Sequence, residues 1–187
     1  LVDSVSCIDD IDSNPEISNN LPSQIALGAF TAYLLVCLVS YSSSDPGYTH
    51  TGVSNDVQNL GGRFGAWFSD LVLNALGYSA YFLPILFGVV CWRLLRGSDS
   101  EGMGYSKLVH GAGMIFVLLS ACGIEFLHYF SWSRTMPFES GGWIGMLAGA
   151  WASDSFGIVG ATVVFLVVFI AGISWSMDVS WFTIMDK

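Results

Sequence analysis

The sequence predicts an all-α membrane protein: four transmembrane helices as two parallel-repeat hairpins, each with a short outer helix that is interfacial or re-entrant. Composition is the first observation behind this prediction, because 53% of the 187 residues are hydrophobic, 11% are charged and the mean hydropathy is +0.60. An average soluble domain has about 25% charged residues. The other two observations are four long uncharged stretches and a repeat of glycines.

The uncharged stretches define the predicted spans. Each contains 17 to 23 consecutive residues without a charged side chain. A helix needs roughly 17–25 apolar residues to cross about 30 Å of hydrocarbon. We therefore predict a four-span membrane domain over residues 24–187, with spans at about residues 24–41, 71–92, 107–129 and 155–177.

The first 23 residues differ from the rest in composition. They contain five acidic residues and no Lys or Arg, and they are rich in Ser, Asn and Asp. This composition predicts a disordered acidic tail, and the missing basic region argues against a signal peptide. The whole chain has a net charge of −9, so we expect no DNA contact by this segment.

The basic residues predict the orientation in the membrane. Three of the six Lys and Arg residues, Arg93, Arg96 and Lys107, lie between the second and third predicted spans. Because cytoplasmic loops carry an excess of Lys and Arg, this loop and both termini are predicted to be cytoplasmic, including the acidic tail.

An internal repeat has an offset of 80 residues. At this offset four glycines at three sites coincide: Gly61-Gly62 with Gly141-Gly142, Gly65 with Gly145, and Gly77 with Gly157. The stretches 63–70 and 143–150 that follow are too short to span, so they are predicted to lie in the outer interface with Trp67 and Trp143 toward lipid. Chance matching among 21 glycines is the alternative to a duplication.

The glycine spacing has two interpretations. Gly141, Gly145 and Gly149 form GxxxGxxxG, and Gly61 with Gly65 forms GxxxG. Small residues on one helix face let another backbone approach closely, which would suit association of subunits. Packing inside the bundle, or a turn, is the interpretation we favour, because glycine is common in membrane helices.

Three polar residues of the predicted spans are candidates for function. Glu125 and His128 are three residues apart, so on a helix they share a face near the outer end of the third span, where a proton relay or ion site could use them. A partly hydrated interfacial pair is the alternative, and we favour it. Asn74, near the outer end of the second span, is predicted to be interfacial or hydrogen-bonded to a neighbouring helix.

Motifs of catalysis and metal binding are missing from the sequence. It contains no GxxxxGK[ST], HExxH, GxSxG or paired CxxC. We therefore expect no enzymatic activity, cofactor or metal in this segment, and an anchor or assembly platform is the function that remains.

The loop after the first span contains an ordered set of motifs. Ser44-Asp45-Pro46-Gly47 predicts a turn in which Asp bonds nearby backbone, Pro restricts φ and Gly tolerates positive φ. Asn59-Leu60-Gly61-Gly62 and Gly65-Ala66-Trp67-Phe68-Ser69-Asp70 follow, and the GG-x-x-G pattern recurs from Gly141. In this order the motifs resemble the N-terminal membrane domain of the FtsK/SpoIIIE family of bacterial DNA translocases, over about residues 24–187.

The resemblance implies a multi-pass protein of the bacterial inner membrane, located at the division septum, that supports cell division and chromosome segregation. It implies divisome membrane proteins as partners besides the lipid bilayer. In the family, a linker and a hexameric ATPase motor follow, so ATP, Mg and hexamer formation belong to a motor outside this chain. The start at Leu1, instead of Met, leads us to expect a fragment of a longer protein.

Candidate contacts with partners or other subunits lie in the outer loops and on the glycine face: Asp45, Pro46, Gly47, Gly61, Gly62, Gly65, Trp67, Gly141, Gly145 and Gly149. The alternative function is a small four-span transporter or channel subunit, with Glu125 and His128 in its pathway.

Overall fold

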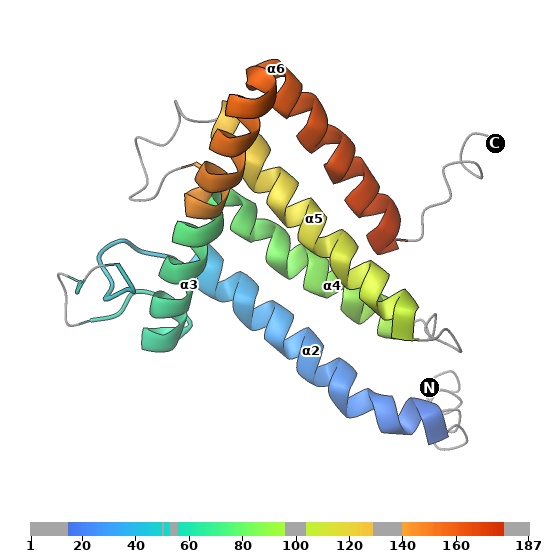
Figure 1. Cartoon of the computed structure of the whole chain (residues 1–187). Helices are drawn as coiled ribbons and strands as arrows, with labels where there is room; N and C mark the ends of the chain where they lie inside the picture. Colours follow the sequence, from blue (N-terminus) through green and yellow to red (C-terminus); the bar gives the residue numbers. More distant parts are fainter. Residues whose placement is uncertain (1–14, 50, 53–55, 96–103, 129–139, 178–187) are drawn as a thin grey trace, which may run out of the picture.

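A computed structural model describes residues 15–49, 51–52, 56–95, 104–128 and 140–177. In this part of the chain every regular element is a helix (Figure 1): α2 (Pro15–Val39), α3 (Gly62–Leu76), the 3₁₀ helix η1 (Gly77–Tyr81), α4 (Phe82–Leu95), α5 (Gly104–His128) and α6 (Gly142–Met177). Four helical segments are long and apolar enough to cross a membrane. The predicted all-α, four-span fold is confirmed.

The spanning helices run alternately up and down one bundle. Figure 1 shows the first residues of α2 and α5 and the last residues of α4 and α6 at one end of the bundle, which we call the inner end. The last residues of α2 and α5 lie at the opposite end, the outer end, together with α3. This alternation matches a chain that crosses a bilayer four times.

Two glycine elbows define the repeat in three dimensions. Gly77 has φ 63° and ψ −143°, and Gly157 has φ 71° and ψ 167°. A side chain is strongly disfavoured in this region of the backbone map. Before each elbow, α3 and residues 142–156 of α6 run across the outer end of the bundle; after it, α4 and residues 158–177 of α6 descend along it (Figure 1). We call residues 142–156 the outer segment of α6.

The elbow at Gly77 divides the second predicted span. Residues 71–76 belong to α3 and residues 82–92 to α4, and the sequence did not predict this break because hydropathy runs smoothly across it. Pro84, the third residue of α4, lies in the first turn, where a missing N–H breaks no helical hydrogen bond.

The tail prediction is wrong for residues 15–23. The helix α2 begins at Pro15, a residue suited to the first turn of a helix because its φ is already helical. Residues 1–14, the remainder of the predicted disordered tail, lie outside the described residues.

The helices pack as two pairs. The helices α5 and α6 lie against each other along much of their length, and α2 packs on α4, whereas α4 and α5 have little direct contact. Glycines permit the close α5–α6 approach: a Cβ at Gly172 would lie 2.8 Å from the carbonyl oxygen of Gly113. The two pairs therefore depend on contacts at the ends of the bundle.

Candidate functional site

The loop after α2 is organised around the buried carboxylate of Asp45. One oxygen accepts a hydrogen bond from the Gln58 backbone nitrogen (2.7 Å) and the other from that of Asn59 (2.8 Å). The sequence predicted bonding to nearby backbone, but these partners lie 13 and 14 residues along the chain. Because Asp45 is only 1% exposed, its side chain holds the loop together from inside and is not available for a direct partner contact.

Asn59 attaches this loop to the start of α3. Its amide nitrogen donates to the Cys37 carbonyl oxygen (2.9 Å), and its side-chain oxygen accepts from the Gly61 backbone nitrogen (2.8 Å). A Cβ at Gly65 would lie 2.7 Å from that same side-chain oxygen. Gly61 and Gly65 therefore pack against the end of α2 in their own chain. Gly62, by contrast, has a positive φ of 69° and no atom near the position of a Cβ.

Asp70 is a second buried carboxylate at the outer end. It accepts hydrogen bonds from the Thr49 backbone nitrogen (2.7 Å), the Thr49 hydroxyl (2.9 Å) and the Tyr41 hydroxyl (3.1 Å). Burial, and then the negative charge of Asp70, raises the pKa of the Tyr41 phenol. A Cβ at Gly47 would lie 2.6 Å from Asp70 Oδ2. Close approach, and not the positive φ predicted from the turn, explains glycine at this position, since Gly47 is not among the positive-φ glycines.

The two outer helices expose apolar stripes. Trp67 and Phe64 on α3 are 42% and 63% exposed, and Trp143, Leu147 and Trp151 on the outer segment of α6 are 57%, 70% and 68% exposed. The ring of Tyr48 lies edge-on to Trp67, with 5.9 Å between centroids. Pro46, two residues before Tyr48, is half-buried. Indole rings favour the headgroup level of a membrane, so these stripes suit an interfacial position.

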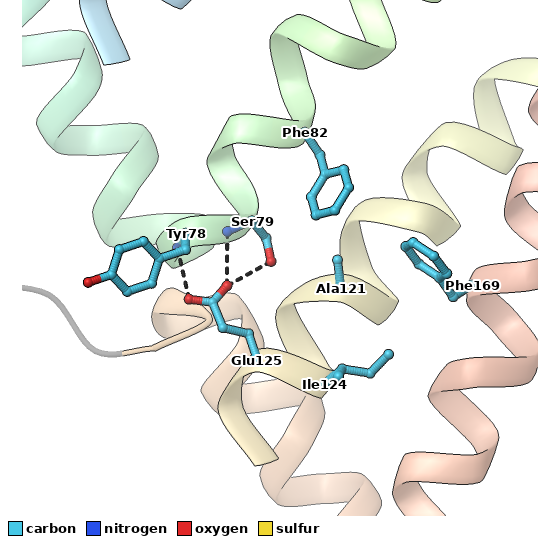
Figure 2. Close-up of a pocket in the computed structure, with 7 residues that line it drawn as sticks. All are labelled: Tyr78, Ser79, Phe82, Ala121, Ile124, Glu125 and Phe169. Carbon is cyan, nitrogen blue, oxygen red and sulfur yellow. Dashed lines mark hydrogen bonds between the residues drawn. The ribbon is translucent and has the colours of Figure 1, made fainter. Parts of the chain in front are cut away.

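Glu125 joins the two hairpins. Its carboxylate accepts hydrogen bonds from the backbone nitrogens of Tyr78 (2.9 Å) and Ser79 (2.9 Å) and from the Ser79 hydroxyl (2.7 Å), as Figure 2 shows. These nitrogens follow the Gly77 elbow at the start of η1, where N–H groups have no partner within the helix. A carboxylate is stabilised at this positive end of a helix.

The predicted Glu125–His128 pair does not form one site. Glu125 is 7% exposed and faces η1, so the partly hydrated pair expected from its position is wrong for this residue. His128 is exposed and its Nε2 lies 2.9 Å from the hydroxyl of Thr162 on α6. Asn74 bonds within α3, to the carbonyl oxygen (3.1 Å) and side chain (3.4 Å) of Asp70, and not to a neighbouring helix.

The glycine face of α6 packs against α5 of the same chain. A Cβ at Gly145 would lie 2.5 Å from the Cys122 carbonyl oxygen, and one at Gly149 would meet the ring of Phe126. Gly141 (φ 74°) approaches Cys122 as well, and Gly142 (φ 59°) approaches the backbone of Ala75 at the end of α3. This face is occupied within the chain, which leaves no room on it for the backbone of a second subunit.

Arg93 connects the hairpins at the inner end. Its guanidinium donates to the Ser176 carbonyl oxygen on α6 (2.6 Å) and lies 3.1 Å from His110 Nε2 on α5. The side chains of Asn59, Asp70, Ser79 and Arg93 were not predicted as site residues. Their polarity within or beside apolar segments is the signal that could have identified them, since buried polar groups are paired.

A cavity of about 690 Å³ lies between the two hairpins. Its walls are Phe82 of α4, Ala121 and Ile124 of α5, and Phe169 of α6, while Tyr78, Ser79 and Glu125 line it at the outer end (Figure 2). Across the described ranges, no three His, Cys, Asp or Glu side chains converge in a way that could hold a metal ion. The site thus consists of structural contacts and one apolar cavity.

Comparison with known families gives a match with nearly the same boundaries as the predicted membrane domain. A family model described as the 4TM region of DNA translocase FtsK/SpoIIIE matches residues 23–187. The chain belongs to this family. It is a membrane-anchor region of the FtsK type, and the resemblance inferred from the loop and glycine motifs is confirmed.

Curated relatives agree with the family match. The chain is 36% identical over 167 residues to DNA translocase FtsK of Pseudomonas putida, covering 87% of this chain and 20% of that protein. It is 31% identical over 170 residues to DNA translocase FtsK 2 of Ralstonia nicotianae, covering 85% of this chain and 21% of that protein. The chain therefore spans about one fifth of the length of these relatives. No solved structure matches it.

Proposed function

We propose that this chain is the membrane anchor and assembly domain of a DNA translocase, which it localises to the division septum in support of cell division and chromosome segregation. The observation that carries the proposal is the family match over residues 23–187. The motor that moves DNA, with its ATP, Mg and hexameric assembly, lies outside this chain in the proposal.

The geometry suits anchoring. Four spans and two outer helices with exposed tryptophans hold the protein at a fixed depth, because lipid-exposed apolar surface and interfacial indoles resist displacement. The buried carboxylates Asp45, Asp70 and Glu125 all accept hydrogen bonds from backbone groups or hydroxyls of other segments. In this proposal they maintain the shape of the domain and do not take part in chemistry or transport.

Divisome membrane proteins are the proposed partners, and the outer loop is the proposed contact surface. The exposed ring of Tyr48 contacts the exposed ring of Trp67 edge-on, and Leu60, two residues before α3, is 80% exposed. Exposed apolar side chains that form a contiguous patch mark sites of interaction with protein or membrane. The buried carboxylate of Asp45 holds the backbone of this loop in place through its hydrogen bonds to Gln58 and Asn59.

Recruitment can be tested with the whole chain fused to a fluorescent protein in dividing bacteria. We expect a band at midcell, and uniform distribution around the envelope would contradict septal localisation. Leu60→Ser should weaken the band if the outer loop contacts a partner, whereas Val159→Ser, at a 79% exposed position on α6, is the matched control and should leave it unchanged.

Orientation has a separate test. In the proposal the inner end of the bundle faces the cytoplasm, so Lys107 and Lys187, the two lysines of the chain, are shielded in intact cells. A membrane-impermeant amine reagent should label them only after the membrane is permeabilised. Labelling of Lys107 in intact cells would contradict the proposed topology and show that this loop faces outward.

A further inference from the structure

The cavity between the hairpins is a space between the two helix pairs. It exists because α4 and α5 have little direct contact, while contacts at Glu125 and Arg93 hold the two helix pairs together at the outer and inner ends. A volume of about 690 Å³ lies within the range of small-molecule sites, roughly 300–1,000 Å³. Away from its outer end its walls are apolar, and the helices around it are long and apolar enough to cross a membrane.

The size of the cavity argues against a helix as its occupant. A helix is about 10 Å across, so a cavity of about 690 Å³ would hold roughly 9 Å of its length, less than two turns. A flexible hydrocarbon chain is thinner and needs no hydrogen-bonded backbone around it. An acyl chain therefore fits the cavity better than a transmembrane segment of a partner does.

Charge identifies the kind of lipid. Glu125 lines the outer end of the cavity, and none of the lining residues is Lys, Arg or His. The three described hydrogen bonds leave one of about four acceptor positions of the carboxylate open. The ammonium of a zwitterionic headgroup complements this end of the cavity, whereas an anionic headgroup without an ammonium offers no cation to pair with the carboxylate.

We propose that the cavity binds one phospholipid, with an acyl chain packed against Phe82 and Phe169, which line the same wall, and the amine of its headgroup at Glu125. The rings of these two phenylalanines lie 6.2 Å apart, edge to face, and would bound the site on its inner side. Glu125 stands three residues from the end of α5, near the outer end of the candidate span Val109–His128. The proposal depends on membrane insertion alone and is independent of recruitment to the septum.

Native mass spectrometry of the purified chain tests the proposal directly. The chain is equilibrated in micelles with equal amounts of phosphatidylethanolamine and phosphatidylglycerol that carry the same acyl chains. We expect one phosphatidylethanolamine retained per chain, with about fivefold preference, which corresponds to about 1 kcal/mol at a partly hydrated ion pair. Equal retention of the two lipids would overturn the proposal, as would a stoichiometric second polypeptide in place of lipid.

Two variants distinguish the contribution of the cavity volume to lipid binding from that of the Glu125 charge. Ala121→Phe fills the cavity and should lower lipid retention at least about fivefold, whereas Ala29→Phe, at an exposed position on α2, should not. Glu125→Gln should keep a bound lipid and bring the preference close to one. Unchanged retention in Ala121→Phe, or an equal loss in Ala29→Phe, contradicts the site. If Ala121→Phe does not fold, the wild-type preference and Glu125→Gln decide the question.

Discussion

The carboxylate of Glu125 lies 2.9 Å from the backbone nitrogen of Ser79 and 2.7 Å from its hydroxyl, although the two residues are 46 positions apart. This contact connects the third span to the first turn of the second. It occurs beside the Gly77 elbow, where a Cβ would meet both the Gly141 backbone nitrogen and Glu125 Oε1. Both halves of the repeat and α5 therefore meet at one point.

Removal of this carboxylate should destabilise the fold. Glu125→Ala removes the acceptor of the buried Ser79 N–H and hydroxyl and of the Tyr78 N–H, so we expect the free energy of unfolding to fall by roughly 3 kcal/mol. Glu125→Gln retains an acceptor oxygen and should cost about 1 kcal/mol. Denaturant unfolding in mild detergent measures both. His128→Gln, at an exposed position, is the control; a loss equal to that of Glu125→Ala would argue against a structural role for the carboxylate.

The two elbows allow a comparison within one chain. Gly77→Ala and Gly157→Ala each impose a strained backbone conformation, which costs roughly 1–3 kcal/mol. Gly77 is crowded by Gly141 and Glu125, whereas no atom lies within 4 Å of a Cβ at Gly157. We therefore expect Gly77→Ala to lower the free energy of unfolding by ~1 kcal/mol more than Gly157→Ala does. Thermal unfolding of the two variants measures the difference. Equal losses would show that strain, and not crowding, dominates at Gly77.

The glycine face can be tested in the same way. Gly145→Ala places a Cβ 2.5 Å from the Cys122 carbonyl oxygen and should destabilise the α5–α6 pair by roughly 1–3 kcal/mol. Gly88→Ala, in the interior of α4 with open space around it, should stabilise by about 0.5–1 kcal/mol because alanine favours a helix. Thermal unfolding distinguishes the two. Were Gly145→Ala to leave stability unchanged and alter only oligomeric state, the face would serve contacts between subunits.

Tyr41 predicts a dependence of stability on pH. Its phenol has a pKa raised from 10.0 by burial and by Asp70, so the neutral form is favoured in the folded state. The stabilisation is fully present below pH 10 and is lost as pH rises through the folded-state pKa. Tyr41→Phe removes the hydrogen bond to Asp70 and should cost about 1 kcal/mol at neutral pH. Unfolding measured from pH 7 to 11 should show this difference constant at first and shrinking above pH 10; a constant difference throughout contradicts the assignment.

Sequence patterns predicted the parts of the fold that depend on composition. Uncharged runs identify four spans, and the 80-residue offset places Gly77 and Gly157 in equivalent positions, which agrees with their shared positive φ. Packing at Gly145 against a helix of the same chain agrees with the interpretation favoured from the frequency of glycine in membrane helices.

Contacts between distant segments could not be predicted in this way. Asp45 bonds the backbone at Gln58 and Asn59, and Glu125 bonds the backbone at Ser79. Local spacing carries no information about such partners, because they meet only after the helices pack. The break at Gly77 inside the predicted second span was missed for a related reason: residues 71–76 are as apolar as the residues after the break, and only the backbone angles of one glycine separate α3 from η1 and α4.

The hydrogen bond from Arg93 to the Ser176 carbonyl oxygen has a mechanical consequence. Ser176 lies one residue before the end of α6, and Arg93 lies in the last turn of α4. A force applied to the chain at Met177 would therefore act on both α4 and α6, because the hydrogen bond from Arg93 must break before the last turn of α6 can unfold. We expect this pair of helices to resist such a force better than α6 alone would.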